Sequence, residues 1–235
     1  IKVMSSCSNL AISGNAISAN DGRGIYLEDP VEQDPISQVT ICNNTLENNG
    51  SEALFLGVNS ANSVTGNCGH GNGINGICIT DIRVDTTWDG SNVALTGEEL
   101  AYVVSDDIIH LTLHGEIPPD ANMSKLSLEP GAVVKVAEGK SVSIARLDIN
   151  NGLVVGPGDE AYITSIHDDQ VGGDTDAMVL TPAPGDWGSF IINTGAQSFN
   201  ASYGVIRYGG GSTNYPSMLG ICAGNAYMEN CTIAE

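Results

Sequence analysis

The sequence is poor in basic and aromatic residues, and it has no long apolar run. Eight Lys and Arg residues stand against 28 Asp and Glu residues, so the 235-residue chain carries a formal net charge of −20. Because phosphate binding needs clustered Lys and Arg, we expect no nucleic-acid partner, and an anionic membrane surface is disfavoured for the same reason. No run of about 18 apolar residues occurs, so we expect no membrane insertion.

Aromatic residues make up only 5% of the chain, whereas glycine is abundant at 29 residues. Few aromatics suit a narrow core of Ile, Val and Leu, and many glycines suit a chain that turns sharply and often. The surplus of carboxylates suits solubility in a salty or extracellular medium. It also suits divalent cations, which prefer oxygen ligands.

Neither the cysteines nor the histidines form a recognisable metal site. The six cysteines show no CxxC pair and no zinc-type spacing, and Cys42 and Cys78 lie in apolar strand patterns that favour buried thiols. A disulfide, for instance between Cys222 and Cys231, stays open. His110 and His114 would share one face of a strand, but no third ligand accompanies them, which favours two ordinary strand histidines.

Three segments share one internal spacing. In each, an apolar triplet follows ten residues after an asparagine, and the asparagines are Asn15, Asn44 and Asn67. A fixed offset, with 29 and then 23 residues between copies, indicates a solenoid whose stacked copies share one core. Asparagines stacked at an inward bend would satisfy buried polar groups along the solenoid, so we predict that these three form a structural ladder.

The strand patterns predict an all-β protein, a β-solenoid with about 20–30 residues per rung. Residues 1–84 are expected to form rungs with the asparagine ladder, and residues 85–125 an irregular connecting segment with short strands. Residues 126–235 are expected to form further rungs with a long Asp/Gly-rich loop at 167–186. The two sets of rungs form either one continuous solenoid or two. Both chain ends lie in strand patterns, as in a processed piece of a longer protein.

Residues 1–84 resemble the right-handed parallel β-helix repeats of the pectin-lyase-like superfamily. An ordered series of later motifs is similar to a module of large secreted or surface-attached microbial β-helix proteins; the motifs lie at residues 128–136, 163–169, 172–175, 184–188 and 205–210. The resemblance implies a right-handed parallel β-helix and an extracellular or cell-surface location. It implies no single activity, since such proteins include lyases, hydrolases, epimerases and adhesive or structural proteins.

The loop at residues 167–186 is the best candidate for a metal site. We expect its aspartates to bind Ca²⁺, which takes about six to eight oxygen ligands; they are Asp168, Asp169, Asp174, Asp176 and Asp186. A long loop without an apolar anchor also needs something to order it. In the resembled module a Gly-Asp-Gly stretch usually follows the Asp-Thr, whereas residues 177–180 read Ala-Met-Val-Leu here. A plain solvated loop is the other interpretation.

These features favour a non-catalytic, structural or adhesive surface module that binds extracellular polysaccharide or other copies of itself. Chain ends that expose unpaired strand edges would allow end-to-end stacking. The alternative is a fragment of a polysaccharide-active lyase, hydrolase or epimerase. Hydrolysis needs two carboxylates across a cleft, for which Asp81 with Asp85 or Asp106 with Asp107 are candidates. Basic residues that would neutralise an acidic substrate are not clustered in the sequence.

Overall fold

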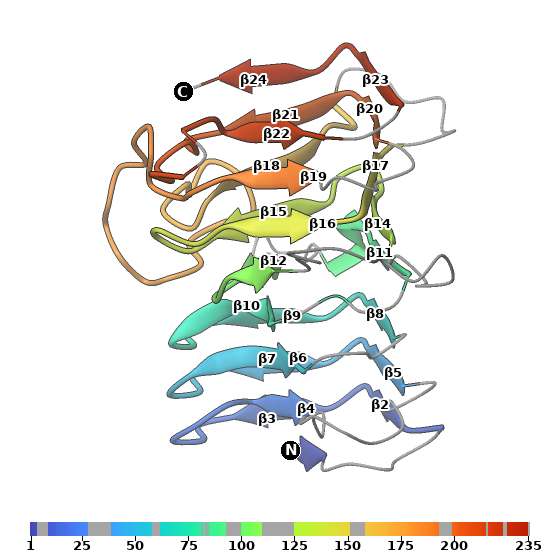
Figure 1. Cartoon of the computed structure of the whole chain (residues 1–235). Coiled ribbons are helices and arrows are strands. Elements are labelled where there is room, and N and C mark those ends of the chain that lie inside the picture. Colours follow the sequence, from blue (N-terminus) through green and yellow to red (C-terminus); the bar gives the residue numbers. More distant parts are fainter. Residues whose placement is uncertain are drawn as a thin grey trace.

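The strands of the chain pair in parallel with the strand one rung away, and the rungs stack from the N-terminus to the C-terminus (Figure 1). The computed structural model describes residues 1–3, 9–27, 39–57, 62–80, 82, 85–92, 100–109, 125–150, 158–192, 199–214, 216–222 and 225–234. Among the residues discussed above, Cys7, Asp81, His110 and His114 lie outside this part of the chain. The described strands form a right-handed parallel β-helix, and the predicted fold class is confirmed.

The longest sheet has nine strands, and each of them comes from a different rung. In spatial order they are β1 (Lys2–Val3), β4 (Ile25–Leu27), β7 (Glu52–Leu56), β10 (Ile74–Ile79), β12 (Ala101–Val104), β15 (Val133–Val136), β18 (Ala161–Ser165), β21 (Gly204–Arg207) and β24 (Thr232–Ala234). Strand β12 comes from the expected connecting segment and pairs with both β10 and β15. One sheet therefore runs through all three predicted segments, whose boundaries stay predictions.

Shorter sheets form the other sides of the helix. In the first three rungs, one contains β2 (Ala11–Ser13), β5 (Val39–Cys42) and β8 (Asn62–Thr65), and another contains β3 (Ala16–Ser18), β6 (Thr45–Glu47) and β9 (Cys68–His70). A five-stranded sheet follows, with β11 (Thr86–Trp88), β14 (Lys125–Leu128), β17 (Arg146–Ile149), β20 (Phe199–Ser202) and β23 (Ala226–Glu229). The last contains β13 (Ile108–Ile109), β16 (Val142–Ile144), β19 (Phe190–Ile192) and β22 (Leu219–Ile221). A 3₁₀ helix, η1, spans Gly90–Asn92.

The core is a narrow stack of apolar side chains, one layer per rung. Strand residues alternate between the two faces of a sheet, so one inward position repeats in register through the long sheet. The residues at this position are Ile25, Leu54, Ile77, Tyr102, Val134, Ile163 and Ile206, all of them buried. Tyr102 stacks on Trp88, with ring centres 4.7 Å apart. Burial of these layers supplies the main driving force for stacking the rungs.

Asn15, Asn44 and Asn67 lie at the bend that precedes β3, β6 and β9, and they are hydrogen-bonded in a column. The Nδ2 of Asn15 donates to the Oδ1 of Asn44 over 3.0 Å, and the Nδ2 of Asn44 donates to the Oδ1 of Asn67 over 2.9 Å. Asn44 Nδ2 also donates to the carbonyl oxygen of Ile12. Because Asn44 and Asn67 are completely buried, these bonds satisfy groups that water cannot reach.

A second column of asparagines stands five residues further along each rung. The Nδ2 of Asn20 donates to the Oδ1 of Asn49 over 2.7 Å, and the Nδ2 of Asn49 donates to the Oδ1 of Asn72 over 2.8 Å. Asn72 in turn donates to the Oδ1 of Asn75 over 3.0 Å. The equal spacing of Asn20, Asn49 and Asn72 from the first column is the signal in the sequence that would have revealed this ladder.

The bend in the last rung and the state of the cysteines were left open by the strand patterns. Asn230, with φ 51°, ends β23 and begins a bend before β24. Left-handed backbone of this kind interrupts a strand, and asparagine tolerates it. The five described cysteines form no disulfide, so Cys222 and Cys231 are thiols.

Candidate functional site

The outward face of the long sheet is where side chains of several rungs can meet a ligand. Its central row is in register from β1 to β18 and contains Lys2, Tyr26, Phe55, Cys78, Val103, Lys135 and Thr164. The loop at residues 167–186 packs over the later part of this row and then projects from the stack (Figure 1). The early part, from Lys2 to Tyr26, is open. The face thus divides into a covered half and an open half.

The loop leaves β18 and folds back across three rungs to reach β10. The backbone N–H of Asn75 donates to the carbonyl oxygen of Thr175 over 2.7 Å, and Asn75 Nδ2 donates to that of Asp174 over 3.2 Å. Between these rungs, Lys135 Nζ donates to the carbonyl oxygen of Gly173 over 2.5 Å. Gly172 has φ +67°, and an added Cβ would lie 3.2 Å from Lys135 Cε, so glycine permits this close approach.

Asp168 and Asp176, two of the predicted calcium ligands, are paired with an arginine and a histidine side chain. The Oδ2 of Asp168 accepts hydrogen bonds from Arg207 Nε over 2.7 Å and from the hydroxyl of Thr164 over 2.5 Å, and Asp168 is 0% exposed. The Oδ2 of Asp176 lies 2.6 Å from Nδ1 of His167. Asp168 therefore holds the loop to the sheet through a charge-assisted contact, whereas Asp176 bonds within the loop.

The other three predicted ligands have different surroundings. Asp174 Oδ1 accepts the backbone N–H of Ala177 over 2.9 Å, and Asp186 Oδ2 accepts the hydroxyl of Ser165 over 2.7 Å. Asp169 is exposed, and its pKa is raised, first by partial loss of hydration and then by the negative charge of Asp174. Four of the five aspartates thus have their own hydrogen-bond partners, and Asp168, Asp169, Asp174 and Asp176 lie around one cation, Lys135.

Lys135 is the central positive charge of this half of the face. Its side chain is 0% exposed, because the loop covers it on the outward side of β15. Burial lowers the pKa of Lys135 below its usual 10.5, while the charges of Asp169, Asp168, Asp176 and Asp174 act in the opposite direction. Lys135 is therefore one counter-charge of the acidic loop in which the sequence predicts a calcium ion.

The carboxylates as arranged do not fit a calcium site. No group of three or more His, Cys, Asp or Glu side chains converges as metal ligands among the residues that the structure describes. Calcium binding stays a prediction of the sequence, and a chelator tests it by thermal melting. A bound ion stabilises the folded state by mass action, so its removal would lower the melting temperature. A melting temperature that a chelator does not change would contradict the predicted calcium site.

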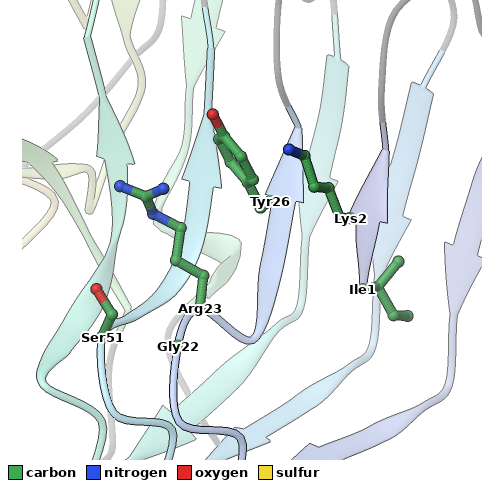
Figure 2. Close-up of a pocket in the computed structure, with 6 residues that line it drawn as sticks. All are labelled: Ile1, Lys2, Gly22, Arg23, Tyr26 and Ser51. Atoms are coloured by element: carbon green, nitrogen blue, oxygen red, sulfur yellow. The ribbon is translucent and has the colours of Figure 1, made fainter.

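The open half of the face holds a pocket of 430 Å³, lined by Ile1, Lys2, Gly22, Arg23, Tyr26 and Ser51. Figure 2 shows Lys2 on β1, Tyr26 on β4 and Arg23 on the turn before β4, all projecting to the same side. The guanidinium carbon of Arg23 lies 4.6 Å from the centre of the Tyr26 ring and 4.1 Å from that of Phe55. Lys2 Nζ lies 5.2 Å from the same Tyr26 ring. Two of the eight basic residues thus flank one tyrosine.

A salt bridge between Arg23 and Glu52 fixes the wall of the pocket. Arg23 Nε donates to Glu52 Oε2 over 2.8 Å, and the hydroxyl of Ser51 donates to the same oxygen. Burial acts to raise the pKa of Glu52, but the hydrogen bonds from Arg23 and Ser51 outweigh it, so this pKa falls below 4.5. The pocket wall is therefore held by a carboxylate that stays ionised in mild acid.

This salt bridge predicts a pH dependence of stability. Because the folded-state pKa of Glu52 is the lower one, its contribution is present above about pH 4.5 and is lost as the pH falls through the folded-state value. We expect the melting temperature of the wild type to fall more steeply below pH 4.5 than that of the Glu52→Gln variant. If the melting temperatures of the two proteins changed in parallel with pH, both above and below pH 4.5, this expectation would be contradicted.

The carboxylate pairs considered for hydrolysis have structural partners where they are described. Asp85 Oδ1 accepts the backbone N–H of Lys125 and pairs with Arg146 at 3.3 Å. Asp106 pairs with Lys140 at 3.1 Å, and Asp107 caps the backbone N–H of Ser141 at 2.8 Å. These contacts join neighbouring rungs on the surface.

The residues that sequence reasoning missed are the cations of the two halves of the face. Lys135 interrupts an apolar strand, and a charge within a buried strand pattern was the available signal. Arg207 is the last residue of β21, directly after Val205 and Ile206. Arg23 and Tyr26 gave no signal beyond their places just before and within the first apolar triplet. Their approach depends on the stacking of β4 on β7, which brings Phe55 and Glu52 beside them.

The stacked parallel strands define the class of protein as a right-handed parallel β-helix. Residues 1–93 match the model of a family described as a right handed beta helix region. The recognised repeat is therefore confirmed. No curated protein and no solved structure matches the chain. No helix among the described residues is long and apolar enough to span a membrane.

Proposed function

We propose that this chain is a non-catalytic, extracellular β-helix module with a structural and adhesive role. Its adhesive site is the pocket beside Tyr26, and its partner is an extracellular polysaccharide or another copy of the chain. The observation that carries the proposal is the aromatic ring of Tyr26 between Arg23 and Lys2, at the edge of a pocket of 430 Å³. Pockets of about 300–1,000 Å³ with an aromatic wall and a few polar groups are typical of ligand sites.

The rigid stack supports the adhesive role. Arg23 is held by Glu52 and by two aromatic rings, so it is preorganised and loses little conformational freedom on binding. The acidic loop also supports a non-catalytic role, because Asp168 and Asp176 are engaged with Arg207 and His167. The net charge of −20 and the β-helix class support an extracellular or cell-surface location.

The alternative function is a polysaccharide-active enzyme, and one observation favours it. Asp169 is an exposed carboxyl group with a raised pKa, which is the property that a general acid needs. This alternative predicts new reducing or unsaturated sugar ends during incubation with polysaccharide, and their loss in the Asp169→Asn variant.

The test is incubation of the chain with soluble and insoluble polysaccharides, with and without calcium, together with light scattering of the chain alone. We expect retention on a polysaccharide or concentration-dependent association for the wild type, and loss of both for Tyr26→Ala. Tyr227→Ala is the matched control, since Tyr227 is an exposed tyrosine on β23, several rungs away. Equal adhesion of the wild type, Tyr26→Ala and Tyr227→Ala would contradict the proposal that the pocket is the adhesive site. New sugar ends would show that the chain is an enzyme.

A further inference from the structure

The 167–186 loop carries an exposed apolar segment, residues 177–180, which we call the tip. Met178 is 54% exposed, Leu180 is 49% exposed, and Val179 is fully exposed at 103%. Soluble proteins seldom place large apolar side chains next to one another in solvent without a partner for them. The anchoring contacts of the loop do not use these three side chains, so the tip is available for another surface.

Hydrogen bonds on both sides of the tip hold its backbone. Asp174 Oδ1 accepts the N–H of Ala177 and Asp176 Oδ1 accepts that of Met178, both over 2.9 Å. After the tip, Asp186 Oδ2 accepts the N–H of Ala183 over 3.1 Å. The tip is therefore a preorganised apolar segment with carboxylates at its base, which reduces the entropy lost when it binds.

We propose that the pocket beside Tyr26 receives the tip of a second copy of this chain. The inference rests on the proposed adhesive function and names the partner of the same site. The pocket offers the complementary chemistry, because an aromatic ring and Ile1 line it while Lys2 and Arg23 stand at its rim. On a chain of net charge −20, this is a site where an apolar segment with an acidic base meets positive charge.

The two surfaces belong to different parts of one molecule. The pocket lies on the first rungs, at β1 and β4, whereas the tip extends from the loop that covers β10 to β15. Within one copy Val179 remains fully exposed, so the tip does not fill its own pocket. A contact between unlike surfaces is heterologous, and its repetition produces a ring or an open filament.

A different surface could also join copies, and the experiment must separate the two. In the last rung the inward-facing Ile221, Met228 and Ile233 are exposed, with Ile233 at 49%. Stacking of one helix on the end of another would cover them. The variant Ile233→Asp places a charge on that end and leaves the tip and the pocket unchanged.

The experiment measures the mass of the chain by sedimentation and light scattering over a range of concentrations, at low and high salt. We expect the wild type and Ile233→Asp to associate more as concentration rises, and salt to weaken both, since it screens the charges at the rim. Val179→Asp should weaken association at least about tenfold, because it places a carboxylate in an apolar contact. Thermal melts confirm that each variant is folded.

A mixture of two blocked variants gives the sharpest outcome. Lys2→Glu reverses a charge of the pocket, whereas Val179→Asp alters the tip, so each protein alone should be monomeric. Mixed, they retain one intact pocket and one intact tip between them, and they should form a dimer that does not grow further. A Val179→Asp variant that associates like the wild type would overturn the inference, as would a wild type that stays monomeric. Retention on polysaccharide that Tyr26→Ala abolishes would then leave the proposed function standing with glycan as its partner.

Discussion

Replacing Asn44 by alanine is expected to lower the free energy of unfolding by about 3 kcal/mol. Its Oδ1 accepts a hydrogen bond from Asn15 Nδ2. Its Nδ2 donates to the Oδ1 of Asn67 and to the carbonyl oxygen of Ile12. Alanine leaves these partners without a substitute in a site that is 0% exposed, and each unsatisfied buried group costs about 1–3 kcal/mol. Urea denaturation of the variant and the wild type measures the difference.

The matched control is Asn15→Ala, at the first position of the same column. Asn15 is exposed, so water replaces the bond that its amide donates to Asn44. We expect this substitution to cost less than about 1 kcal/mol. Similar losses for the two variants would mean that burial of the ladder does not set its energetic value.

Replacing Arg207 by methionine is expected to lower the free energy of unfolding by about 3–5 kcal/mol. The substitution removes the partner of Asp168, a completely buried carboxylate at the start of the loop. A buried charge without a partner is far more costly than the ion pair itself is stabilising. Denaturant unfolding measures the loss, and limited proteolysis shows whether the loop is released.

The double variant Asp168→Asn/Arg207→Met separates the charge from the packing. Asparagine keeps the shape of Asp168 and still accepts the hydroxyl proton of Thr164 through its Oδ1, but it carries no charge. We expect the double variant to be more stable than Arg207→Met alone, which is the coupling expected of residues in contact. Equal stabilities would indicate that lost packing around Tyr162 and Tyr208 explains the effect.

The rungs could be predicted from the sequence where the asparagine and the apolar triplet that follows it are repeated at a fixed spacing. The spacing from Asn44 to the triplet 54–56 is set by the path of a single rung, so it survives when the distance between rungs changes from 29 to 23 residues. The side chains of the ladder bond their counterparts on the adjacent rungs and backbone carbonyls of the strands just before the bend. This is the regularity that a period in the sequence records.

The covered half of the outward face could not be predicted in the same way. Lys135 meets the loop 38 residues later, and Arg207 meets Asp168 39 residues earlier, in contacts that are not repeated between the described parts of other rungs. The acidic loop suggested a cation, and the sequence offered no means to decide between a metal ion and a lysine on the strand beneath. The acidic residues of the loop can be read from the sequence. That Lys135 lies beneath them depends on the register of β15 with β18, which the sequence does not show.

The return of the 167–186 loop to Asn75 has a consequence for how the molecule unfolds. A solenoid held only by contacts between adjacent rungs can open one rung at a time from either end. Here the bonds from Asn75 to Thr175 and from Lys135 to Gly173 connect β10 to the segment that follows β18. The rungs between them cannot separate until these bonds break, so this middle section should open as one cooperative block while the outer rungs fray.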